Sequence, residues 1–68
     1  MTVAKIIELV GQSSVGWEDA VRNAISRAHE TVEDITGVEV LNQTARVDHG
    51  EISEYKVNVK LAFGVRED

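Results

Sequence analysis

Residues Ser13–Gly37, SSVGWEDAVRNAISRAHETVEDITG, carry the one long helical pattern in this 68-residue sequence. We expect Ser13 or Ser14 to cap the first turn, because a serine hydroxyl accepts hydrogen bonds from free backbone amides. Gly37 is expected to end the helix, since glycine favours the left-handed position after the last turn. The apolar residues recur in steps of three and four, which predicts an amphipathic helix with one apolar face: Trp17, Ala20, Val21, Ala24, Ile25, Ala28, Val32 and Ile35.

The segments on either side of this helix have the composition of strands. VAKIIELV, residues 3–10, is apolar and β-branched and ends before Gly11. Residues 38–47 predict a weaker strand, which we expect at an edge, and DHGE at 48–51 predicts a turn. Residues 52–65 alternate most regularly, with one apolar face on which we expect the helix to pack: Tyr55, Val57, Val59, Leu61, Phe63 and Val65.

The sequence therefore predicts an α+β fold of order β-α-β-β, in which a three-stranded antiparallel sheet packs on one amphipathic helix. The last strand is expected at the centre, and residues 1–68 are expected to form a single domain. One helix leaves one sheet face and two edges open, and exposed edges pair with other chains. With no cysteine and no Cys/His cluster to stabilise so small a fold, we expect a homo-oligomer.

Charge and composition exclude several classes of protein. Twelve acidic against seven basic residues give a net charge of −5, which repels phosphate backbones and anionic lipids. We therefore expect neither a nucleic acid nor a membrane as a partner. The lack of cysteine, of a signal-peptide pattern and of a long apolar run predicts a cytoplasmic protein.

No catalytic motif is found. The loop GQSSVG at 11–16 begins like a phosphate-binding loop, but Trp17 and Glu18 stand where that motif needs lysine and then serine or threonine. His29 and His49 have no second histidine or cysteine at metal-ligand spacing. Since no set of nucleophile, base and acid emerges, we do not expect an enzyme.

An acidic cluster is the strongest candidate for a cation site. Glu30, Glu33 and Asp34 fall in the predicted last helical turn, where the helix dipole disfavours acids. They are either a charged surface that aids solubility or a site for a cation or for a basic group from a neighbouring chain. Carboxylate oxygens suit Ca²⁺ or Mg²⁺, so these three residues and Asp48 are the candidate metal ligands.

Several segments together resemble the dodecin family over nearly the whole chain. They are KIIELVG at 5–11 with the serines at 13–14, Ala24-Ile25 and Arg27-Ala28 with Thr31-Val32, VEV at 38–40, Glu54-Tyr55 with Val57, and Ala62-Phe63. The resemblance implies a hollow homododecamer with its helices outside and its sheets lining the interior. It also implies non-catalytic storage or sequestration of a flavin, either riboflavin or FMN.

At the flavin-site positions that the resemblance implies, the sequence departs from the family. Gly37 matches the tryptophan that stacks on the flavin, Lys56 matches the glutamine that bonds its ring, and Thr44 matches a basic residue near the phosphate. An aromatic platform contributes about 1 to 3 kcal/mol per stacked ring, so its loss predicts weaker flavin binding. The alternative is a flavin-free cage that binds calcium-type cations, as in dodecin-like proteins without the aromatic, or that is purely structural.

Overall fold

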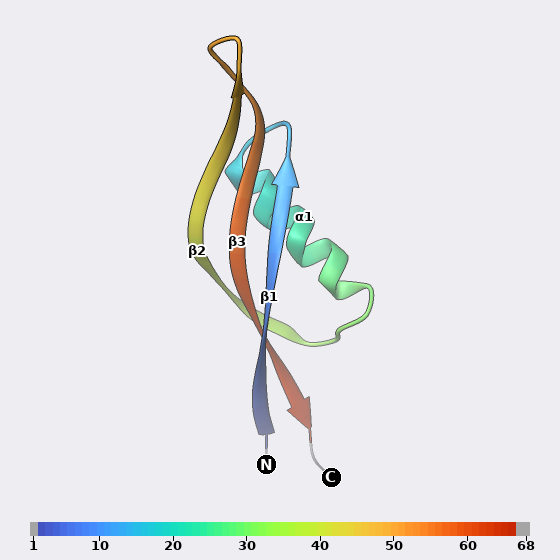
Figure 1. The fold of residues 1–68 in the computed structure, drawn as a ribbon. Coiled ribbons are helices and arrows are strands. Elements are labelled where there is room, and N and C mark those ends of the chain that lie inside the picture. The colour runs from blue at the N-terminus through green and yellow to red at the C-terminus, as the bar shows by residue number, and fades with distance from the viewer. Residues whose placement is uncertain (1, 67–68) are drawn as a thin grey trace.

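The computed structural model describes residues 2–66 and contains one helix and three strands. Their order is β1 (Thr2–Ser13), α1 (Trp17–His29), β2 (Ile35–Asp48) and β3 (Glu51–Arg66) (Figure 1). All strand pairs are antiparallel. These elements confirm the predicted α+β class and the β-α-β-β order.

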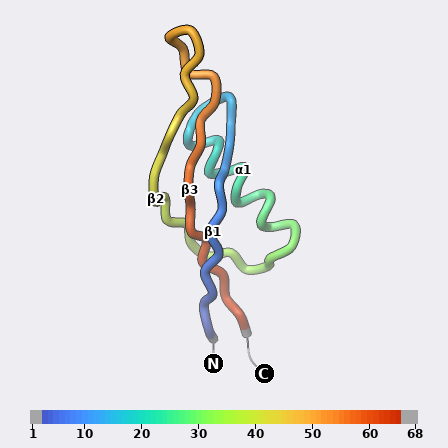
Figure 2. Tube along the Cα trace, in the orientation of Figure 1, coloured from blue at the N-terminus to red at the C-terminus, as the bar shows by residue number. Residues whose placement is uncertain are grey.

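Strand β3 occupies the centre of the sheet, between β1 and β2, as the sequence predicts. Its pairing with β1 is unbroken over the whole of β1, and its pairing with β2 continues beyond β1 to the hairpin turn. The turn residues His49 and Gly50 both have positive φ, at 53° and 78°, which confirms the predicted turn. Figure 2 shows this turn at one end of the molecule and the start of β1 beside the end of β3 at the other.

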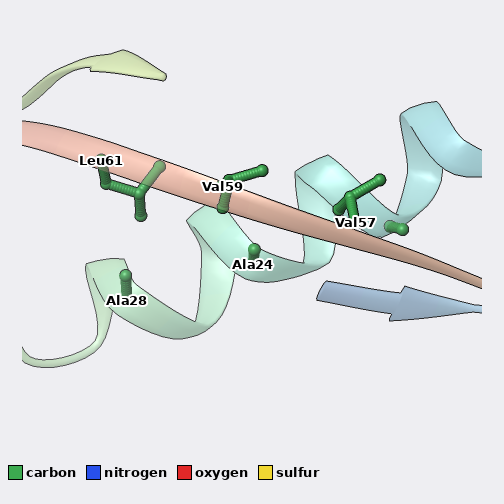
Figure 3. Close-up of a cluster of buried hydrophobic side chains, with 6 residues drawn as sticks. Ala24, Ala28, Val57, Val59 and Leu61 are labelled. Atoms are coloured by element: carbon green, nitrogen blue, oxygen red, sulfur yellow. The ribbon is translucent and has the colours of Figure 1, made fainter. Parts of the chain in front are cut away.

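The core lies between α1 and one face of the sheet. Val57, Val59 and Leu61 of β3 face the alanines of α1, which confirms that the helix packs on the apolar face of the last strand (Figure 3). Alanines let the helix approach the sheet closely, because they add little volume between the two layers. Partly buried residues complete the packing: Ile7, Leu9, Trp17, Val21, Ile25 and Ile35.

The helix begins later than predicted. Its N-cap is Gly16, which has no side-chain capping bond, so neither Ser13 nor Ser14 is the cap. Ser13 lies at the end of β1 and organises the turn instead. Its hydroxyl accepts a hydrogen bond of 2.9 Å from the Val15 amide and donates one of 2.6 Å to Asp19 Oδ2. The serine therefore links the strand to the first turn of the helix without capping it.

The helix also ends earlier than predicted. It stops at His29, and Gly37 lies inside β2. The left-handed residue is Asp34, with φ of 64°, a conformation that aspartate tolerates better than most residues. The Gly64 amide donates a 3.1 Å hydrogen bond to the Asp34 carbonyl, which ties the loop after α1 to β3. The chain therefore turns into β2 before the predicted end of the helix.

The fold is thin and elongated. It measures 55 × 20 × 12 Å, and its radius of gyration of 14.1 Å exceeds the roughly 11 Å of a compact chain of this length. Its accessible surface of 5095 Å² likewise exceeds the roughly 4,200 Å² typical of a folded monomer of this mass. Within residues 2–66, no helix is long and apolar enough to cross a membrane.

Candidate ligand-binding face

The sheet face opposite α1 is covered by no element of residues 2–66, and we call it the open face (Figure 1). Because side chains alternate along a strand, it is formed by the even-numbered residues of β1 and β3 and by their partners on β2. The register aligns them in rows across β1, β3 and β2: Ile6, Ala62 and Gly37; Glu8, Lys60 and Glu39; Val10, Asn58 and Asn42; Gln12, Lys56 and Thr44.

The second row places one cation between two anions. Lys60 of β3 is the register partner of both Glu8 on β1 and Glu39 on β2. Opposite charges on neighbouring strands stabilise a sheet, and here one lysine is the cross-strand neighbour of two carboxylates. Lys60 is half-buried, whereas both glutamates are exposed. The middle of the open face is therefore charged, with a net negative row.

Gly37 lies at an apolar end of the open face. An ideal Cβ at position 37 would stand 3.9 Å from the Ala62 Cβ, an ordinary van der Waals contact. Ile6, the partner of Ala62 on β1, is 57% exposed. The glycine therefore leaves room for a bulky group beside apolar side chains.

Lys56 and Thr44 lie directly opposite each other on β3 and β2. Lys56 Nζ is 3.7 Å from Glu54 Oε1, and the lysine side chain keeps 46% of its surface exposed. Both Thr44 and Lys56 are thus accessible from the open face. A hydroxyl beside an ammonium group can bind an anionic group such as a phosphate.

The three flavin-site positions do not meet within one chain. Lys56 faces Thr44, whereas Gly37 faces Ala62, and the six steps from residue 56 to residue 62 span about 20 Å of strand. None of the three aromatic residues reaches the open face: Tyr55 and Phe63 lie on the helix side of β3, and Trp17 belongs to α1. A pocket that uses all three positions therefore needs more than one copy of the chain.

The four candidate metal ligands are also dispersed. Glu30 follows the helix, Glu33 and Asp34 lie in the loop to β2, and the Asp48 carboxylate is 3.5 Å from Arg46 Nε near the hairpin turn. The expected place of Glu30, Glu33 and Asp34 in the last helical turn is wrong, because that turn holds Arg27 and His29. Among residues 2–66, no group of three metal-ligating side chains is close enough to hold an ion. The metal assignment stays a prediction.

One contact at Thr44 is not predicted by the sequence. Trp17 is half-buried against Tyr55, with ring centroids 4.9 Å apart at 81°, and its indole N–H donates a 3.0 Å hydrogen bond to the Thr44 carbonyl. The apolar pattern predicts that Trp17 packs in the core, and it does so in part. No local pattern indicates the bond to Thr44, because the two residues lie 27 positions apart.

The fold and the open face define a class of small α+β subunit, in which one helix covers one face of an antiparallel sheet and the other face is uncovered in the single subunit. The family model for dodecin matches residues 3–66. The chain belongs to the dodecin family, whose members are small ligand-binding proteins.

Individual relatives are similar to this chain over almost its full length. Calcium dodecin of Mycobacterium tuberculosis is 33% identical over 66 residues, which are 97% of this chain and 93% of the relative. The structure of that calcium-chelating protein, described with a novel calcium-binding site, superposes with a TM-score of 0.80 at 34% identity, covering 97% of this chain and 94% of that one. Dodecin from Streptomyces coelicolor superposes with a TM-score of 0.92 at 31% identity, covering 98% and 96%.

Proposed function

We propose that residues 1–68 form one domain that assembles into a closed, hollow, cytoplasmic homododecamer. This assembly stores or sequesters a small ligand and catalyses no reaction. The observation that carries the proposal is the open face, a sheet surface that the subunit does not cover by itself. Exposed apolar residues at its margins support burial by other copies, among them Ile6, Val10 and Leu41.

A flavin is the first ligand class. The space at Gly37 accommodates a planar ring against Ala62, and Lys56 with Thr44 offers a cation and a hydroxyl to the phosphate of FMN. Because these positions are about 20 Å apart along the sheet, each pocket draws on at least two copies. Without an aromatic platform, the affinity is expected to be weaker by about 1 to 3 kcal/mol for each unstacked ring.

Two measurements test this proposal. Light scattering of the purified protein is expected to give the mass of twelve subunits, and a long-lived monomer in dilute solution would contradict the assembly. Riboflavin and FMN fluorescence is expected to be quenched on titration with the protein. If the protein is a dodecamer but leaves the fluorescence of both flavins unchanged, flavin binding is excluded while the proposed assembly stands.

A divalent cation is the second candidate ligand, favoured by the similarity to a calcium-binding relative and by the missing aromatic. Twelve copies would carry a net charge of −60 (12 × −5), which attracts cations into the assembly. Glu30, Glu33, Asp34 and Asp48 from different copies would supply carboxylate oxygens. A ligand that binds only the folded state raises the unfolding temperature, so Ca²⁺ is expected to raise it relative to a chelator. An unchanged unfolding temperature in excess Ca²⁺ would exclude this candidate.

A further inference from the structure

The part of β2 that carries Thr44 is isolated from the rest of its ladder. Register shifts relative to β3 lie between Val40 and Asn42 and between Arg46 and Val47. The register of residues 42–46 with β3 therefore does not follow from the register of the pairs on either side. A slip of one residue would turn Thr44 from the open face to the helix side, because side chains alternate along a strand. Something must hold this segment in its observed register.

Trp17 contacts both strands at this row from the helix side. Its indole N–H donates to the Thr44 carbonyl at 3.0 Å, and its ring packs edge-on against Tyr55. Tyr55 directly precedes Lys56 in β3 and is the register partner of Ala45. One side chain therefore bonds the backbone of Thr44 on β2 and packs against the residue that precedes Lys56 on β3.

Within residues 2–66, the other side-chain hydrogen bonds of this segment lie at its two ends. Asn58 Nδ2 donates to Asn42 Oδ1 at 3.1 Å, and Ser53 Oγ donates to the Arg46 carbonyl at 3.3 Å. The bond from Trp17 falls at the middle of the segment. Within residues 2–66, it is the one side-chain hydrogen bond that connects α1 to β2.

We propose that Trp17 is a positioning residue, which fixes the register of residues 42–46 and so keeps Thr44 beside Lys56 on the open face. The register part of this inference depends on no ligand. The ligand part rests on the proposed function, because it assumes that an anionic group binds at these two residues.

Amide hydrogen exchange tests the register part. Trp17→Phe keeps an aromatic ring against Tyr55 but removes the N–H donor, so exchange at residues 43–45 is expected to accelerate about five- to tenfold while β1 is unaffected. The matched control is Ser26→Gly, at an exposed position of α1, which loosens the helix without touching this bond. Wild-type exchange at residues 43–45 in Trp17→Phe overturns the inference, as does equal acceleration in both variants.

FMN titration tests the ligand part. Trp17→Phe is expected to weaken FMN binding about five- to tenfold while Ser26→Gly leaves it unchanged. Unchanged FMN affinity beside accelerated exchange overturns the role in ligand positioning. If the wild-type protein binds no FMN, the flavin version of the proposed function fails, and the exchange measurement alone decides whether Trp17 sets the register.

Discussion

Gly11 of β1 lies so close to Ala20 of α1 that an ideal Cβ at position 11 would stand 2.2 Å from the Ala20 carbonyl oxygen. The same Cβ would lie 3.1 Å from the Ala24 Cβ. Helix and strand approach this closely because one residue has no side chain and the two facing it have small ones. This contact sets the distance between the helix and the sheet and leaves no room for a larger side chain at position 11.

Gly11→Ala is therefore expected to lower the free energy of unfolding by about 3 kcal/mol, because the added methyl group meets backbone that has no room to shift. Urea denaturation at fixed protein concentration measures the change. The control is Gly16→Ala, where an added Cβ meets nothing within 4 Å, and its effect is expected to be below about 1 kcal/mol. Similar losses in both variants would contradict the close contact.

The left-handed conformation at Asp34 predicts a second stability difference. Asp34→Val is expected to lower the free energy of unfolding by about 1 to 2 kcal/mol, because a β-branched residue tolerates φ of 64° poorly. Asp34→Asn keeps the shape and the tolerance but removes the charge, so it is expected to be nearly neutral. Thermal unfolding of both variants measures the difference, and equal unfolding temperatures would argue against the strained turn.

The row formed by Glu8, Lys60 and Glu39 predicts a charge-dependent effect. Lys60→Glu would place three carboxylates side by side and is expected to lower the free energy of unfolding by about 1 kcal/mol. Lys5→Glu is the matched control, since it makes the same change in net charge at an exposed position opposite Phe63.

Denaturation of both lysine variants at low and high salt tests whether the row acts through charge. Added salt screens like charges, so the gap between the variants is expected to narrow as ionic strength rises. A gap that does not respond to salt would show that the row acts through packing and not through charge.

Gly37 predicts a gain of function. Gly37→Trp adds an aromatic platform in open space on an apolar surface, so riboflavin binding is expected to tighten about five- to hundredfold. Riboflavin fluorescence titration measures the affinity, and Gly37→Ala controls for filling the space without a ring. If the tryptophan variant binds no more tightly than the alanine variant, position 37 does not contact the flavin ring.

The alternation of residues 52–65 was enough to predict the central strand, its buried face and the order of the sheet. The end of the helix was not predictable in the same way. Val32 and Ile35 continue the helical spacing, yet Ile35 reaches the core from β2. The loop after the helix is held by a hydrogen bond between Asp34 and Gly64. Contacts between positions so far apart give no local pattern in the sequence.

The candidate site was predictable only in part. The alternation of β3 places Lys56 on the face away from the helix, as observed. That Thr44 opposes it depends on the register shift between Arg46 and Val47, which no local sequence pattern predicts. The expected cluster of Glu30, Glu33 and Asp34 assumed a longer helix. Because the helix ends at His29, these residues do not share a helical turn.

The pairing of β1 with β3 brings residues 2 and 66 side by side, at the end of the molecule opposite the hairpin turn. A short peptide could join the two positions covalently, and the chain could then be opened at residues 49–50 with every strand intact. Such a circular permutant would keep the same packing while moving its ends to the far tip of the sheet. A cargo protein fused to this subunit could in this way be displayed from either end of the sheet by choice.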